Sequence, residues 1–201
     1  MTALRAAEHA GLQHEFEVAI VRCDVTGHAA DIGRRFAQVA RAFADGRCAL
    51  EALRQAQLLK GDAIHSPTSW NSDRLCLLFG GETTVELTGD GVGGRNQEMV
   101  LAFLIEAARL GLGESTVDFA LLSAGTDGQD GPTDSAGAFA DRHAVGTVDQ
   151  QDAQRCLQNN DSYSFWKAFD NGRCHLLIGH TGTNVMDVQG LLLSRRSADI
   201  E

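Results

Sequence analysis

The feature that most constrains the fold of this chain is a recurring change from an apolar run to a polar, glycine-rich segment. The apolar runs are nearly continuous, which is typical of strands that are buried on both faces of a sheet. They cover residues 14–21, 74–79, 117–124 and 175–179. Apolar residues at helical spacing predict helices over 28–44 and 95–111. We therefore expect an α/β fold with a mixed, largely parallel sheet that is flanked by helices.

A second kind of strand is predicted directly after the run at 74–79. Residues 83–87 alternate in character and follow the pair Gly80–Gly81, which is suited to a tight turn. We expect 74–79 and 83–87 to pair as a hairpin.

Composition limits the classes of partner. The 201 residues carry a formal net charge of −10, which argues against non-specific binding to nucleic acid. The five cysteines are scattered without metal-ligand spacing, so buried, reduced thiols in a reducing compartment are expected. No apolar run reaches the roughly 18–20 residues of a membrane span, and the first residues lack a secretory apolar core. We expect a cytoplasmic protein with no membrane partner.

The first candidate site is the segment 89–94, GDGVGG, which leads into the helix at Arg95. Its spacing satisfies G-x-G-x-x-G, but a dinucleotide site also needs an acidic residue on a following strand, and Glu114 comes before that strand. Glycines let the backbone approach a ligand, a helix N-terminus offers N–H groups, and Arg95 offers a planar fork for carboxylate or phosphate. Alternatively, the glycines only make a turn and Arg95 pairs with a nearby glutamate.

A second candidate site is the loop after the strand at 117–124. Asp127, Asp130 and Asp134 lie there among glycines, at the end of a strand where α/β sheets commonly bind ligands. Their carboxylates suit Mg²⁺ or a general base. Alternatively, they cap backbone N–H groups in successive turns, and at least one is expected to do only that.

A third polar segment follows the strand at 175–179. His180, Thr183 and Asn184 lie there among turn-forming residues. Thr181, Thr183 and Asn184 form either another ligand loop or a helix cap.

Four motifs in this order carry a resemblance to a known family: GGETTVELTGDGVGGRNQE (80–98), SAGTDGQDGPTDSAGAF (123–139), NNDSYSFW (159–166) and TGTNVMD (181–187). They resemble the C-terminal MOFRL region of the glycerate kinase family, the glycerate 2-kinase and hydroxypyruvate reductase-like group. The resemblance implies ATP-dependent phosphorylation of D-glycerate with Mg²⁺, in a cleft between two domains. It therefore implies glycerate and a nucleotide as partners.

The resemblance also implies roles for particular residues. Arg95 matches the family's RNQE arginine and Asp127 its TDG aspartate, so both are expected to be catalytic. Arg95 is expected to bind the glycerate carboxylate or the transferred phosphate. Asp127 is expected to hold Mg²⁺ or to take the hydroxyl proton, with Asp130 supporting it. The residues expected to bind substrate or phosphate are Glu82, Gly93, Gly94, Asn96, Asp130, Thr183 and Asn184.

The same resemblance divides the chain. Residues 1–46 resemble the tail of the family's N-terminal domain, 47–73 are a variable linker, and 74–201 are the MOFRL-like domain. Family members begin with a long domain that carries a catalytic lysine, and this chain has almost none of it; its only lysines are Lys60 and Lys167, neither in a glycine-rich loop. We expect little or no kinase activity from the chain alone, and an apolar former domain interface prone to association. The alternative is a catalytically inactive binding module that retains the fold.

The chain also departs from the family's motifs. Where the family more usually has T-G-P-T-G-T-N-V, residues 178–185 are IGHTGTNV. The role of His180 is therefore left open.

Overall fold

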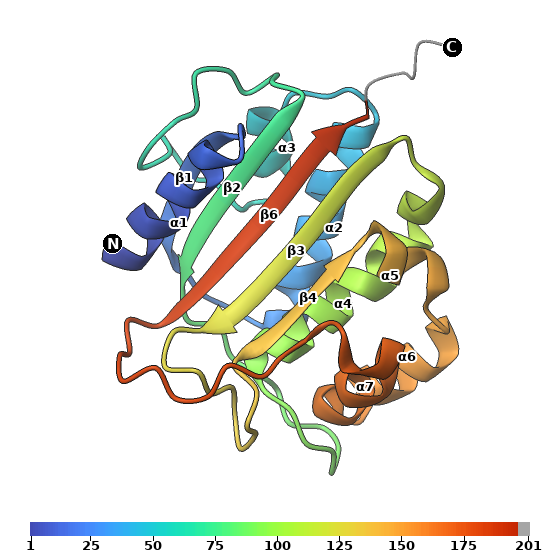
Figure 1. Cartoon of the computed structure of the whole chain (residues 1–201). Helices are drawn as coiled ribbons and strands as arrows, with labels where there is room; N and C mark the ends of the chain where they lie inside the picture. Colours follow the sequence, from blue (N-terminus) through green and yellow to red (C-terminus); the bar gives the residue numbers. More distant parts are fainter. Residues whose placement is uncertain (197–201) are drawn as a thin grey trace.

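The strands of this computed structural model, which describes residues 1–196, form one six-stranded sheet in the order β1-β2-β6-β3-β4-β5 (Figure 1). Their bounds are β1 Glu17–Val25, β2 Arg74–Gly81, β3 Val117–Gly125, β4 Gly137–Asp141, β5 His175–Leu176 and β6 Asp187–Arg195. The α/β class and the mixed sheet are confirmed.

The expectation of a largely parallel sheet is wrong. Among the strands of residues 1–196, only β1 and β2 form a parallel pair, because β6 lies between β2 and β3 and runs antiparallel to both. Strands β3, β4 and β5 are also antiparallel to their neighbours. The continuous apolar runs arise because both faces of the sheet carry apolar side chains, which is also possible in an antiparallel sheet.

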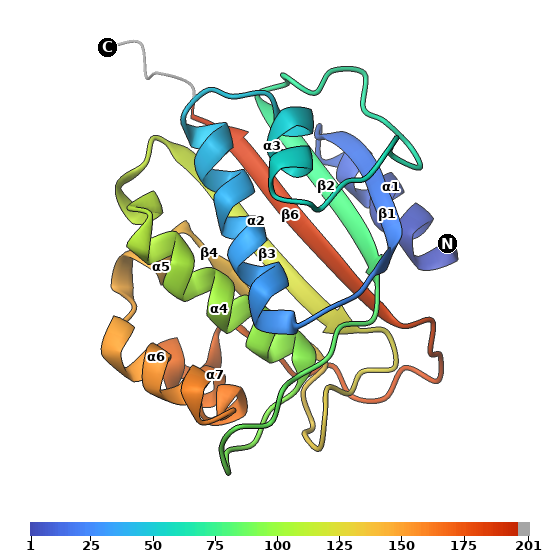
Figure 2. The same ribbon diagram turned by 180° about the vertical axis from the view of Figure 1, so that it is seen from behind.

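One face of the sheet is covered by two long helices, α2 (Ala29–Ala44) and α4 (Arg95–Arg109), which lie side by side (Figure 2). Phe36 of α2 packs edge-on against Phe79 of β2, with ring centroids 4.9 Å apart. The helices come so close at Gly33 that a Cβ there would lie 2.1 Å from the Met99 carbonyl oxygen. This packing fixes the start of α4 against one end of the sheet.

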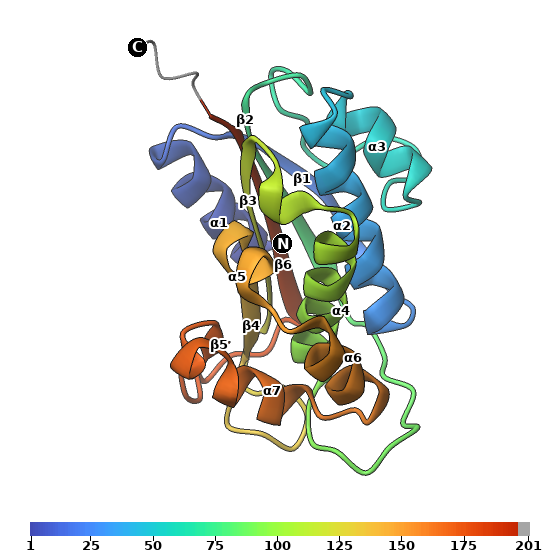
Figure 3. The same cartoon turned by 90° about the vertical axis from the view of Figure 1, so that its right-hand side faces the viewer.

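The remaining helices are shorter. They are α1 (Thr2–Gln13), α3 (Ala49–Gln55), α5 (Arg142–Thr147), α6 (Gln150–Gln158) and α7 (Ser162–Ala168), with 3₁₀ turns at Leu112–Glu114 and Phe169–Gly172. Among these, α1 lies on the sheet face opposite α2 and α4, where it packs against β1 and β2 (Figure 3). None of the helices in residues 1–196 is both long and apolar enough to cross a membrane.

The rest of the α1 face carries a shallow apolar groove of about 510 Å³. Its lining residues include Phe16, Leu78, Ala120, Leu122, Phe139 and Leu192. Leu192 is 36% exposed there.

Two strand expectations are wrong. Residues 83–87 form no strand and no hairpin with β2; the segment makes one parallel bridge, between Thr84 and His28, and Leu87 is 80% exposed. The run at 175–179 contributes only His175–Leu176, because Leu177 and Ile178 turn out to solvent. Conversely, the apolar run 188–193, for which no strand was predicted, belongs to the central strand β6.

The predicted division of the chain at residues 46 and 73 stays a prediction. In the structure, β1 of the first segment pairs with β2, and α2 packs on α4. The last five residues of the predicted domain 74–201 lie outside the described part of the chain.

Candidate active site

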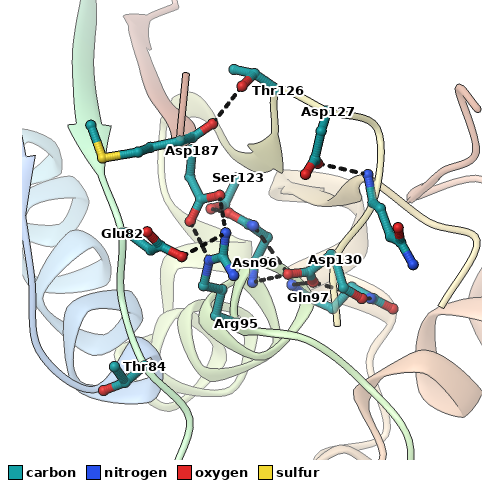
Figure 4. Close-up of polar contacts among 12 residues, drawn as sticks. Glu82, Thr84, Arg95, Asn96, Gln97, Ser123, Thr126, Asp127, Asp130 and Asp187 are labelled. Atoms are coloured by element: carbon teal, nitrogen blue, oxygen red, sulfur yellow. Dashed lines mark hydrogen bonds and ion pairs between the residues drawn. The ribbon is translucent and has the colours of Figure 1, made fainter. Parts of the chain in front are cut away.

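The predicted site residues meet at one end of the sheet. In the strand register, Asp187 of β6 lies between Gly81, the last residue of β2, and Gly125, the last residue of β3. Glu82 therefore leaves the sheet on one side of Asp187, and Asp127 leaves it on the other (Figure 4). The predicted pair Thr183 and Asn184 comes just before β6, and α4 begins at this edge with Arg95.

Arg95 is held by an acid that the sequence analysis missed. Its Nε and Nη2 donate to the two carboxylate oxygens of Asp187 at 2.6 and 2.8 Å, and the Asp187 side chain is fully buried. Glu82 lies 3.4 Å from Nη2. Hydrogen bonding to Asp187 raises the pKa of Arg95 above its usual value. Within residues 1–196, Nη1 makes no hydrogen bond, and the side chain is 27% exposed, so the guanidinium can still take an anion.

Asp130 is buried, where it caps the N-terminus of α4. Its fully buried carboxylate accepts four hydrogen bonds, from the backbone and side-chain nitrogens of Asn96 and Gln97, at 2.9–3.1 Å. Burial raises the pKa of Asp130, and these hydrogen bonds oppose the rise. The N–H groups expected to face a ligand at the start of α4 are therefore bonded to Asp130 at positions 96 and 97.

A buried polar network anchors the same turn. Ser123 donates to Asn96 Oδ1 at 2.5 Å, the Trp166 indole donates to the Gln97 carbonyl at 2.9 Å, and His175 Nε2 lies 3.1 Å from Gln97 Oε1. Burial lowers the pKa of His175, which favours its neutral form. Asn96 and Gln97 thus point inward, whereas Arg95 stays at the open edge.

The glycine-rich segment packs against residues 159–162. The N–H groups of Gly89 and Gly91 donate to Asn160 Oδ1 and the Asn159 carbonyl, and Val92 N donates to Asp161. These three amides are therefore unavailable to a phosphate.

Gly93 and Gly94 are close-packing positions. A Cβ at Gly93 would lie 2.1 Å from Ser162 Oγ, and one at Gly94 would lie 2.3 Å from Asp130 Cγ. Their small size lets the chain pass between Ser162 and Asp130 before it enters α4.

Asp127 lies half-buried on the β3 side of the site. Its Oδ1 accepts from Gln129 N at 3.0 Å and its Oδ2 from Asn184 Nδ2 at 3.2 Å, so the structure joins the second and third predicted segments. Thr183 and His180 are exposed on the loop that precedes β6. No three His, Cys, Asp or Glu side chains in residues 1–196 are grouped closely enough to hold a metal ion by themselves.

A groove of about 550 Å³ opens on the β2 side of Arg95. Its lining residues include Glu82, Thr83, Arg95, Glu98, Pro132 and Asn160, and we call it the Arg95 groove. Glu98 is 7% exposed, and burial is the main cause that raises its pKa. Neither Lys60 nor Lys167 lines this groove.

A family model described as the MOFRL family matches residues 75–187, which is more than half of the chain. The chain belongs to the MOFRL family. A glycerate kinase of Mus musculus is 50% identical over 121 residues, which are 59% of this chain and 23% of the relative. An uncharacterised protein of Caenorhabditis elegans is 41% identical over 194 residues, 96% of this chain and 39% of the relative.

A solved structure extends the likeness to the fold. The crystal structure of glycerate kinase from Thermotoga maritima matches with a TM-score of 0.67 at 32% identity, over 92% of this chain and 38% of that one. This MOFRL chain thus spans about two fifths or less of the relatives it matches.

Proposed function

We propose that this MOFRL chain provides one wall of the active site of a glycerate kinase, which phosphorylates D-glycerate to a phosphoglycerate with ATP. The observation that carries the proposal is the Arg95 fork held by buried Asp187, with Asp127 on the neighbouring strand end. Phosphoryl transfer depends mainly on positioned charge, and a fixed guanidinium supplies that. The proposed location is the cytoplasm.

In this proposal Arg95 binds the glycerate carboxylate or the transferred phosphate through Nη1. Asp127 takes the acceptor hydroxyl proton or contributes to Mg²⁺ binding, and Asn184 orients its carboxylate. Asp130 positions Arg95 through the cap of α4. In this proposal exposed Thr183 borders the phosphates.

The carboxylates of the site fit Mg²⁺ only as part of a ligand set that water and phosphate complete. With no group of three ligating side chains in residues 1–196, an ion would be held by one carboxylate, that of Asp127, with water and phosphate oxygens filling the other positions. A bound Mg²⁺ would neutralise charge on the transferring phosphate.

The second candidate is an inactive module that keeps the fold and binds a small ligand. The observation that favours it is that neither lysine of the chain lines the Arg95 groove.

Association through the apolar face of β6, β3 and β4 is a further prediction, which sedimentation of the chain tests.

The deciding experiment is a chimera. The segment of the Thermotoga glycerate kinase that aligns with this chain is replaced by this chain, and ATP-dependent phosphorylation of D-glycerate is measured. We expect activity in the chimera and little or none in the isolated chain. Arg95→Ala should lower kcat/KM by about 100-fold or more, the scale for removing one group that stabilises transition-state charge.

The control is Arg155→Ala, which removes an exposed arginine paired with Asp152 on α6. It should leave kcat/KM unchanged. A folded but inactive chimera would favour the binding module, and an active chimera that tolerates Arg95→Ala would refute the role of Arg95.

A further inference from the structure

Thr83 is a buried side chain with an unsatisfied hydroxyl. It lines the Arg95 groove and is 2% exposed, and its Oγ1 has no hydrogen-bond partner within residues 1–196. A buried hydroxyl without a partner costs free energy, so such groups are uncommon in native proteins. Here the missing partner can come from a molecule in the groove.

Glu98 is a second residue of this groove whose hydrogen-bonding capacity is only partly used. It lies one turn after Arg95 on α4, and its Oε2 accepts from Asn160 Nδ2 at 3.3 Å. Within the described residues, no side chain donates to Oε1. One carboxyl oxygen of Glu98, Oε2, is thus held by Asn160, and the other, Oε1, is free to bond a ligand.

The charges in the groove select the kind of ligand. Glu82 and Glu98 line it together with one cation, Arg95, whose Nε and Nη2 are already bonded to Asp187, so Nη1 is left for a ligand. A phosphate with two negative charges would face two carboxylates at this end, whereas a monoanion needs only Arg95. Hydroxyl groups on that monoanion would satisfy Thr83 and Glu98.

We infer that the Arg95 groove binds a short hydroxy acid, with its carboxylate on Arg95 and its hydroxyl groups on Thr83 and Glu98. This inference rests on the proposed function and assigns the acceptor, not the nucleotide, to the β2 side of Arg95. The phosphate donor is then left to the β3 side, where Asp127 and Asn184 lie.

The test compares probes that share a carboxylate and differ in hydroxyls. D-Glycerate, 3-hydroxypropionate and propionate are titrated into the ¹⁵N-labelled chain, and dissociation constants are taken from amide shifts at residues 83, 95 and 98. We expect D-glycerate to bind about tenfold more tightly than propionate. Thr83→Val should reduce this ratio towards one and leave propionate binding unchanged, and Glu98→Gln should also reduce the ratio.

Matched variants separate recognition from folding. Thr83→Ser keeps the hydroxyl and should restore the ratio, while Thr147→Val and Glu106→Gln change an exposed threonine and a glutamate farther along α4. Thr83→Val should raise the Tm of the free chain by about 2–4 °C, because it removes the unsatisfied hydroxyl. It should at the same time weaken glycerate binding, a combination that a purely structural threonine would not produce.

Two results would overturn the inference, and they differ in what they say of the proposed function. An unchanged ratio in both Thr83→Val and Glu98→Gln, with propionate still lost in Arg95→Ala, refutes the hydroxyl assignment alone. No binding of any probe at 20 mM refutes both the groove and the carboxylate role of Arg95.

Discussion

At the scale of single residues, the arginine fork depends on Asp187. Asp187→Asn leaves the Arg95 guanidinium without its buried charged partner, although Glu82 remains 3.4 Å away, and breaking a buried pair costs about 3–5 kcal/mol. Arg95 is partly exposed, so we expect a smaller loss, about 2 kcal/mol, in the free energy of unfolding. Urea denaturation measures it. The exposed pair Asp73–Arg195 gives the control, since Asp73→Asn should change stability by about 0.5 kcal/mol or less; equal losses in both variants would contradict the argument.

The pH dependence of stability at Glu98 follows from its burial. Its pKa in the folded chain is raised above the ordinary value of 4.5, by burial first and also by the charge of Asp130. A raised carboxyl pKa favours the folded state at low pH, and that contribution is lost as pH rises through the folded-state pKa. The stability of the wild type relative to Glu98→Gln should therefore fall between pH 4.5 and neutrality. Urea titrations of both proteins test this, and a flat difference would show that Glu98 keeps its ordinary pKa.

The sequence singles out candidate side chains at the site but not the partners that hold them. Arg95 and Asp127 stand out in the sequence as charged side chains among glycines at element ends. Asp187 did not, although it closes the TGTNVMD motif, because only the register of β6 against β2 and β3 places it under Arg95. An unsatisfied hydroxyl such as that of Thr83 has no sequence signature.

At the scale of elements, the start of α4 is positioned by its contact with α2. Gly33→Ala would place a methyl group 2.1 Å from the Met99 carbonyl oxygen, so the helices must move apart. We expect a loss of about 1–3 kcal/mol or more in unfolding free energy, the range for overpacking. Gly146→Ala in α5, where a Cβ meets nothing within 4 Å, should be neutral or slightly stabilising. Thermal unfolding compares the two, and equal Tm values would refute the tight contact.

Periodicity predicted α2 and α4 well, because each carries a strong apolar face. It failed at 83–87, where alternating residues belong to a loop that Thr84 ties to His28 through a single bridge. Alternation indicates which side chains share a face, but a strand also needs a neighbouring strand to bond, and β2 is already flanked by β1 and β6.

At the scale of the whole molecule, the site exists because β6 lies between β2 and β3. Gly81 ends β2 and Gly125 ends β3, and these strands are far apart in the sequence. The insertion of β6 brings both ends to either side of Asp187. Sequence patterns identify apolar runs but not their order or direction in the sheet. That is why the expectation of a largely parallel sheet failed, and why Asp187 was missing from the residues predicted for the site.

The central position of β6 gives a prediction for the whole chain. The family match ends at Asp187, where β6 begins, so a chain cut after Asp187 keeps the matched residues but loses the strand that joins β2 to β3. We expect this truncated chain to lose cooperative urea unfolding and dispersed amide signals. In the full chain, Leu191→Ala, at a fully buried position of β6, should cost about 2–5 kcal/mol. Its neighbour Leu192 points to the opposite face and is 36% exposed, so Leu192→Ala should cost about 1 kcal/mol or less. Equal costs for the two variants, or cooperative unfolding of the truncated chain, would show that β2 and β3 hold together without β6.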